Sequence, residues 1–186
     1  LALVEAYGVT KDSELKPKAQ AAIDFIVESQ HEEGGWRYKP KERGDLSVTG
    51  WMVMALASAK MSGLIIPQST LDGVDNFLEI ISGGKDGGSY GYTDSPGKGN
   101  SGKNAMNAAG FFCAQLNGAS SNAAKAFESS LIIDKAGFQM NDIYYVYYGT
   151  LAAYQHQGPV WRKWLAKMHS EFLKTQEPEG SWPVGG

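Results

Sequence analysis

Apolar residues along the chain follow two alternating patterns. The first is a one-sided stripe at helical spacing with polar residues between its members, which predicts helices that have one face in water. The stripe occurs over residues 16–29, 69–81 and 160–174 and, more weakly, over 120–133. These four segments are therefore predicted to be amphipathic surface helices.

The second pattern is an apolar run with few polar interruptions. It covers 51–59, 104–116 and 143–154, and the opening LALVEAYG fits it too. A helix that is apolar on every side is buried on every side, so we expect four buried helices. The run IYYVYYGT also has strand-forming residues, but TLAAYQ follows directly and favours a helix.

Buried and amphipathic segments alternate, which predicts an all-α repeat protein. Glycines recur in the buried runs at Gly50, Gly110 and Gly149, and the intervals of 60 and 39 residues both suit one helical hairpin with its loops. An open solenoid tends to make both helices of a pair amphipathic. The alternation therefore favours two concentric layers, with inner helices buried and outer helices half-exposed.

Two short segments repeat one spacing of Gln, Gly and Trp. They are QHEEGGW, with Gln30, Gly34 and Trp36, and QEPEGSW, with Gln176, Gly180 and Trp182. A Gln amide can donate to the unsatisfied last carbonyls of a helix, Gly permits the left-handed turn that stops it, and Trp covers the corner. We expect these six residues to fasten helix corners. GKDGGSY (84–90) is a degenerate copy without Gln, and the corner near Gly137 keeps neither partner.

QHEEGGW and QEPEGSW resemble the QW motif of the squalene cyclase and prenyltransferase repeat superfamily. The resemblance implies an α/α toroid, in which the Gln ends an outer helix and the Trp lies near the start of the next inner helix. It implies that residues 1–186 form a single toroid-type domain of about eight helices, a partial or small ring. Because the chain opens without Met, we expect a fragment of a longer protein.

The resemblance also implies where a cyclase would carry its acid. Class II cyclases of this superfamily use Asp-x-Asp-Asp-Thr-Ala, in which the middle Asp protonates an alkene or epoxide. In GDLSVTGW, Asp45 matches the first Asp and Thr49 the Thr, but Ser47 takes the place of the acid and Val48 that of the third Asp. A serine hydroxyl cannot protonate an alkene. This copy therefore looks catalytically silent, and Asp45 or Ser47 suits a helix N-cap.

A cluster of tyrosines predicts the lining of a central cleft. Tyr144, Tyr145, Tyr147 and Tyr148 follow Asp142 on about one and a half helical turns. They either line a cavity and stabilise a carbocation by cation–π attraction, or fill the middle of the ring and bond one another through their hydroxyls. Asp142 is either an N-cap or a buried acid. Three residues expected to join this ligand-binding cleft are Trp51, Asn104 and Asn107.

No metal or cofactor site is predicted. Prenyltransferases of the superfamily bind zinc through an Asp-x-Cys pair and a distant His, but Cys113 follows two phenylalanines and the three histidines are scattered. The Cys-Gly-Glu-Gln of toroidal thioester domains is missing, and we interpret Cys113 as a small buried residue. GKGNSGKN (97–104) is similar to a phosphate-binding loop, but Asn104 replaces the magnesium ligand and no buried strand precedes it.

Composition narrows the function by exclusion. With 186 residues, 42% hydrophobic and 20% charged, the chain is typical of one globular domain. The net charge of −3 without a basic stripe leaves no electrostatic footprint for nucleic acid. No apolar run approaches the ~18 residues of a membrane span, and no signal peptide is visible.

Two functions stay open on these observations. The first is a non-catalytic binding module whose aromatic cleft takes an apolar, sugar-like or peptide ligand. The second is a terpenoid cyclase-like enzyme, an intramolecular lyase or isomerase, which cyclises a polyprenyl or triterpene substrate with Asp45 or Asp142 as the acid. Exposed ring edges would also favour a protein partner or a homodimer.

Overall fold

The computed structural model describes residues 1–96 and 104–182, and the described residues form an all-α fold. The helices are α1 (Ala2–Thr10), α2 (Leu15–Ser29), α3 (Leu46–Ser62), α4 (Gln68–Ile80), α5 (Asn104–Leu116), α6 (Ala124–Ala136), α7 (Ile143–His156) and α8 (Gly158–Thr175). The short strands β1 (Ser82–Gly83) and β2 (Ser89–Tyr90) pair antiparallel, with Ser82 opposite Tyr90. The all-α class predicted from the sequence is confirmed. None of the described helices combines the length and apolar character needed to cross a membrane.

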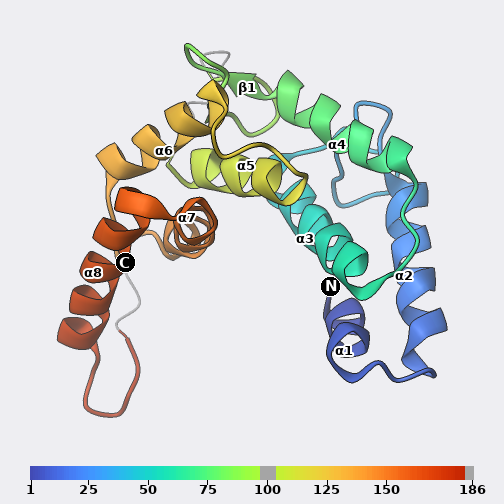
Figure 1. Ribbon diagram of the computed structural model, residues 1–186, viewed down its shortest axis with the longest axis horizontal. Helices are drawn as coiled ribbons and strands as arrows, with labels where there is room; N and C mark the ends of the chain where they lie inside the picture. The colour runs from blue at the N-terminus through green and yellow to red at the C-terminus, as the bar shows by residue number, and fades with distance from the viewer. Residues whose placement is uncertain (97–103, 183–186) are drawn as a thin grey trace.

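The helices are arranged in two curved layers (Figure 1). Helices α1, α3, α5 and α7 follow one another along the inside of the curve, and each contacts the next. Helices α2, α4, α6 and α8 lie on the outside. In this view the described residues trace an arc that is open on one side, between the α1 end and the α8 end.

The inner helices are less buried than their apolar composition predicts. Helix α5, in the middle of the arc, is buried over most of its length. By contrast, Trp51 on α3 and Tyr147 on α7 are 44% and 42% exposed, and Leu3 and Val9 on α1 are exposed as well. The prediction of burial on every side is therefore wrong for α1, α3 and α7. In Figure 1 the described inner helices have outer helices on one side of the curve only, so apolar composition on every side does not require burial on every side.

Element boundaries differ most at α3, which begins five residues before its apolar run 51–59 and ends three residues after it. Helix α5 has the predicted ends, whereas α6 begins at Ala124, four residues later than its stripe suggested. Residues 143–150 are helical, which excludes the strand alternative for IYYVYYGT.

The core lies between the two layers and includes large aromatic side chains. Trp36, Phe77, Tyr90 and Trp164 are each at most 3% exposed. Burial of a large apolar side chain contributes roughly 1.5–3 kcal/mol, so these contacts dominate the cohesion between the layers.

Two of the recurring glycines have a packing reason. A Cβ at Gly110 would lie 2.2 Å from the Tyr90 ring, and a Cβ at Gly149 would lie 2.4 Å from the Trp164 ring. Both aromatic rings therefore lie directly on the backbone of an inner helix, which only glycine permits.

Candidate functional site

The first corner, residues 30–36, is a tight turn held by its own Gln and Trp. Gln30 has an extended backbone, and its side-chain Nε2 donates to the Gly34 carbonyl at 2.8 Å. Gly34 has a φ of +92°, and its N–H donates to the His31 carbonyl at 2.8 Å. The Trp36 indole N–H donates to the Ile26 carbonyl at 2.8 Å, and the ring is buried.

The fourth corner, residues 176–182, repeats this geometry. Gln176 is extended and donates from Nε2 to the Gly180 carbonyl at 3.0 Å. Gly180 has the same φ of +92°, and the Trp182 indole donates to the Phe172 carbonyl at 2.9 Å. In both corners the indole reaches a carbonyl ten residues earlier, so the shared spacing corresponds to a shared structure.

The roles within the corner differ from those we expected. The Gln does not donate to the last carbonyls of its own helix, because its extended backbone leads the chain away from that helix. The Trp36 indole N–H donates to one of these carbonyls instead, since Ile26 is one of the last four residues of α2. Gly34 shapes the turn that follows and does not stop the helix itself.

The first corner is also joined to the next outer helix. Gln30 Nε2 donates to the Thr70 carbonyl on α4 at 3.0 Å. A Cβ at Gly34 would lie 1.7 Å from the Gly73 carbonyl oxygen, so the turn rests on the backbone of α4. Only glycine fits at Gly34 in this contact, whereas a Cβ at Gly73 would meet the Gln30 side chain at 2.6 Å.

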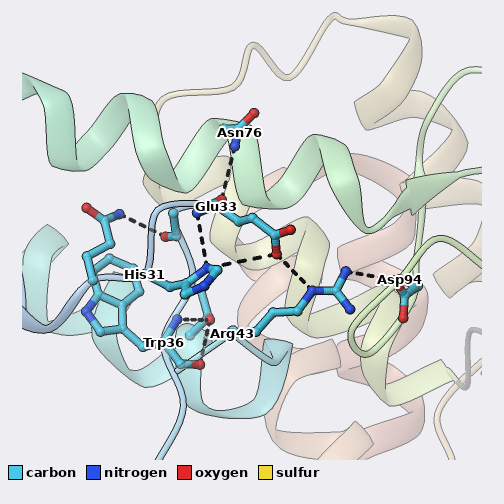
Figure 2. A network of polar contacts seen from close by, with 9 residues as sticks. His31, Glu33, Trp36, Arg43, Asn76 and Asp94 are labelled. Carbon is cyan, nitrogen blue, oxygen red and sulfur yellow. Dashed lines mark hydrogen bonds and ion pairs between the residues drawn. The ribbon is translucent and has the colours of Figure 1, made fainter. Parts of the chain in front are cut away.

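Polar contacts surround this junction (Figure 2). The Asn76 side chain on α4 donates to the Glu33 carbonyl at 3.1 Å. Arg43 donates from Nε to Glu33 and from Nη2 to Asp94, each at 2.9 Å. These hydrogen bonds, that of Asp94 first, raise the pKa of Arg43 above its ordinary value. The guanidinium thereby ties the first corner to the loop after β2.

The second corner, residues 84–90, uses a carboxylate where the Gln is missing. The backbone N–H groups of Lys85, Asp86 and Gly88 donate to the Glu128 carboxylate of α6 at 2.7, 2.8 and 2.7 Å. The Ser129 hydroxyl donates back to the Gly88 carbonyl at 2.8 Å. Burial alone would raise the pKa of Glu128, but the three N–H donors outweigh it and hold that pKa below its ordinary value.

The corners are fastened to the inner helices by side chains that accept from the backbone. The Trp36 N–H donates to the Thr49 hydroxyl at 3.0 Å, and the Tyr90 N–H donates to Asn107 Oδ1 at 2.8 Å. The structure thus places Asn107, buried, at the second corner. Asn104 is the half-buried first residue of α5.

The third corner, after α6, has an aromatic residue of its own. Gly137 has a φ of +67°, and the Phe138 ring meets the rings of Trp164 and Phe172 edge-on at 5.5 and 5.9 Å. An ion pair of 2.8 Å between Lys163 and Asp134 joins α8 to α6 beside it. Phe138 therefore partly replaces the missing Trp.

Asp45 is fully buried and caps α3. Its Oδ1 accepts from the Val48 N–H at 2.9 Å and from the Ser47 hydroxyl at 2.6 Å, and its Oδ2 lies 3.4 Å from Arg37 Nε. The Ser47 hydroxyl is also 3.3 Å from the Tyr92 hydroxyl. Ser47, the residue that the resemblance aligns with the cyclase acid, therefore donates to the carboxylate beside it.

Asp142 is the N-cap residue of α7, as Asp45 is of α3. Its Oδ1 accepts from the Tyr145 N–H at 2.9 Å, and the residue is half-buried. Both candidate acids therefore make the contacts of an N-cap.

The tyrosines of α7 divide into two pairs. Tyr145 lies between the layers, edge-on to Trp164 at 5.4 Å, and Tyr148 packs against Phe112 of α5. Burial raises the pKa of both phenols well above the ordinary value. Tyr144 and Tyr147 are 36% and 42% exposed.

Tyr147 and Trp51 bring α7 and α3 together across α5. Their rings stack at 6.0 Å with an interplanar angle of 24°, and the Tyr147 hydroxyl lies 3.7 Å from Met54 Sδ. We name Trp51, Tyr144 and Tyr147 the aromatic patch. Ser47 lies four residues before Trp51, at the start of α3, and its hydroxyl is 3.3 Å from the hydroxyl of Tyr92 in the loop after β2.

Cys113 is a free thiol on α5. Cys113 is fully buried, and burial raises the pKa of its thiol to about 12. In the parts of the chain that the structure describes, no group of three or more His, Cys, Asp or Glu side chains is placed to hold a metal ion. The loop-like segment GKGNSGKN lies outside the described residues, except for Asn104.

Sequence reasoning missed Glu128, Arg37 and Tyr92. The sequence indicates the need for Glu128 only indirectly, because a glycine-rich corner without Gln needs another acceptor for its backbone N–H groups. Arg37 and Tyr92 meet Asp45 and Ser47 from neighbouring loops, and no spacing in the sequence indicates those contacts.

Comparison of the chain with protein-family models, curated proteins and solved structures found no match. The functional interpretation therefore rests on the geometry of the corners, the two capped acids and the aromatic patch.

Proposed function

We propose that this chain is a squalene cyclase and prenyltransferase-like repeat domain that binds a ligand and does not catalyse a reaction. The helices form one inner and one outer layer, and two corners repeat a Gln–Gly–Trp turn. Both observations support an α/α toroid in the form of a partial ring. The engagement of both candidate acids as helix caps supports the non-catalytic part of the proposal.

The observation that carries the binding function is the exposed stack of Trp51 and Tyr147. Large aromatic side chains on two helices stay about two-fifths exposed while their rings stack at 6.0 Å with an interplanar angle of 24°. Exposed aromatic faces of this kind bind flat apolar surfaces, including the C–H face of a sugar ring. Because the Ser47 and Tyr92 hydroxyls lie at the start of α3, the helix that also carries Trp51, we favour a sugar-like ligand.

A titration of the protein's tryptophan fluorescence with oligosaccharides and with squalene tests this proposal. We expect a saturable change with an oligosaccharide that is lost in Trp51→Ala. Tyr38→Ala removes another exposed aromatic side chain and is the matched control, since Tyr38 is 80% exposed. Equal loss in both variants, or no response to any ligand, would contradict the proposal.

Cyclase-like chemistry is the second candidate, favoured by one observation. Asp45 is fully buried beside Ser47, at the end of an inner helix that also carries Trp51. Incubation with squalene and shorter prenyl substrates separates the two candidates. Formation of a cyclised product that Asp45→Asn or Asp142→Asn abolishes would establish the enzyme and exclude the binding module.

A further inference from the structure

Turns that lead from an inner helix to the next outer helix meet the preceding outer helix. In the first such turn, the backbone of Ile65 exchanges two hydrogen bonds of 2.9 Å with the Gln20 side chain of α2. In the second, the Asn117 side chain donates to the Leu71 carbonyl of α4 at 3.0 Å and to Asp75 at 2.6 Å. A side-chain amide therefore closes both of these junctions.

The third turn, from α7 to α8, is not closed in this way. Among the described residues no hydrogen bond joins residues 156–159 of this turn to residues 121–127 at the start of α6. A groove of about 590 Å³ lies between them instead, and its walls include Ser121, Asn122, Phe127, His156, Gln157 and Pro159. We name it the α6–α8 groove. Its volume is typical of small-molecule sites, which span roughly 300–1,000 Å³.

Gln157, in the wall of this groove, has a backbone conformation that favours glycine. It follows α7 with a φ of 65° and a ψ of −160°, a region that almost only glycine populates. In the two earlier turns the residues with a positive φ are glycines, Gly63 at 78° and Gly118 at 102°. The Gln157 side chain donates to the Tyr154 carbonyl at the end of α7. A glutamine held in a strained conformation beside a groove points to a role other than stability.

The walls of the α6–α8 groove are polar without being charged. The carboxamides of Asn122 and Gln157 and the hydroxyl of Ser121 can each donate and accept hydrogen bonds. The His156 ring packs against Phe111 at 5.6 Å, and burial lowers the pKa of its imidazole below the ordinary value of 6.5. His156 is therefore neutral at pH 7, and the groove offers a charged ligand no opposite charge.

We infer that the α6–α8 groove binds an uncharged sugar. Sugar hydroxyls both donate and accept hydrogen bonds, which matches the amides and the hydroxyl of its walls. The C–H face of a sugar ring is apolar and suits the ring of Phe127, which is 62% exposed. An ionic ligand would lose its hydration in the groove without gaining a partner of opposite charge. The inference is independent of the aromatic patch, since none of the patch residues lines this groove.

An NMR titration of the nitrogen-15-labelled chain with maltotriose, cellotriose and N-acetylated chitotriose tests this site. We expect a saturable shift of the Asn122 and Gln157 side-chain amide signals with at least one of these neutral sugars. The Trp51 indole signal reports the aromatic patch in the same spectra, so the two proposals succeed or fail separately. Glucuronic acid and trialanine are the comparison ligands. Amide signals that respond to none of the sugars up to their solubility limits, or only to a comparison ligand, overturn the inference.

Phe127→Ala should weaken binding of the responding sugar by about tenfold or more, because the apolar face of the groove is lost. Phe25→Ala is the matched control, since Phe25 lies on another outer helix and is also 62% exposed. It should leave the dissociation constant unchanged. Equal affinity of the Phe127→Ala protein and the original protein overturns the inference.

Gln157→Gly should change stability and binding in opposite directions. Relief of the backbone strain raises the melting temperature by roughly 2–4 °C. Loss of the carboxamide raises the dissociation constant of the sugar about fivefold. Lys11→Gly is the control, because Lys11 also has a positive φ, of 55°, but does not line the groove, and it should leave binding unchanged. A Gln157→Gly protein that binds the sugar as tightly as the original overturns the part assigned to Gln157.

Discussion

Gln30 Nε2 donates to the Thr70 carbonyl at 3.0 Å and so joins the first corner to helix α4, forty residues further along the chain. Glu128 of α6 makes the corresponding junction at the second corner, where its carboxylate accepts from backbone N–H groups of the corner. At both corners the corner donates and the outer helix accepts, but the side chain comes from the corner at the first junction and from the helix at the second. Cohesion of the arc depends on such contacts between neighbouring repeats.

Gln30→Ala should destabilise the protein more than Gln176→Ala. The first substitution removes two partly buried hydrogen bonds, to Gly34 and Thr70, and we expect a loss of about 1–2 kcal/mol in the free energy of unfolding. The second removes one exposed hydrogen bond and should cost less than about 0.5 kcal/mol. Urea unfolding of dilute protein measures both. Equal losses would show that the contact with α4 adds nothing.

The Glu128 carboxylate should make stability depend on pH in the acid range. Its pKa in the folded protein lies below the ordinary value of 4.5, so the unfolded chain binds its proton first as the pH falls. The stabilisation is complete above that ordinary value and is lost as the pH falls through the lower folded-state pKa. Thermal unfolding followed from pH 6 down to about pH 3 should therefore show a smaller decline in Glu128→Gln than in the original protein.

At neutral pH, Glu128→Gln should lower the free energy of unfolding by about 1 kcal/mol, less than hydrogen bonds to a charged group usually contribute, because the site is partly open to solvent. Glu32→Gln, at an exposed glutamate of the first corner, is the control and should leave the acid profile unchanged. An identical decline in Glu128→Gln and the original protein would contradict this assignment.

Local signals in the sequence predicted most of the fold. Helix α5 has both predicted ends, and the Gln–Gly–Trp spacing indicates the corners because the whole turn lies within seven residues. The partners across the layers were not predictable. Thr70 and Glu128 lie about forty residues from the corners they hold, and nothing in their own neighbourhood marks them.

The candidate site was harder to predict than the fold. Apolar composition led to the expectation that α3 and α7 are buried throughout, whereas Trp51 and Tyr147 are about two-fifths exposed. A hydrophobic run does not distinguish a covered face from a face that is kept open. Asn107 looked like a cleft residue, but the Tyr90 N–H takes its side-chain oxygen.

Gly110→Ala should destabilise the fold, although alanine is the better helix former. Its Cβ would lie 2.2 Å from the buried Tyr90 ring, and such overpacking costs roughly 1–3 kcal/mol. Gly50→Ala is the matched control in another inner helix, because its Cβ would lie 3.1 Å from the Tyr148 hydroxyl, a far looser contact than that at Gly110. There we expect a change between zero and a gain of about 1 kcal/mol from helix propensity. Thermal unfolding of both variants makes the comparison, and a stabilised Gly110→Ala protein would show that Tyr90 moves aside freely.

Asp45 and Asp142 cap α3 and α7 with the same 2.9 Å contact to a backbone N–H, but only Asp45 is fully buried. Asp142→Ala should therefore cost about 1 kcal/mol, as for an ordinary N-cap. Asp45→Ala also removes the 2.6 Å hydrogen bond from the Ser47 hydroxyl and empties a fully buried site beside Arg37, so we expect about 2–3 kcal/mol. Asp45→Asn keeps the capping oxygen and should recover most of that loss. Urea unfolding of the three variants measures these differences. If Asp45→Asn is as unstable as Asp45→Ala, the negative charge beside Arg37, rather than the cap, holds this end of α3.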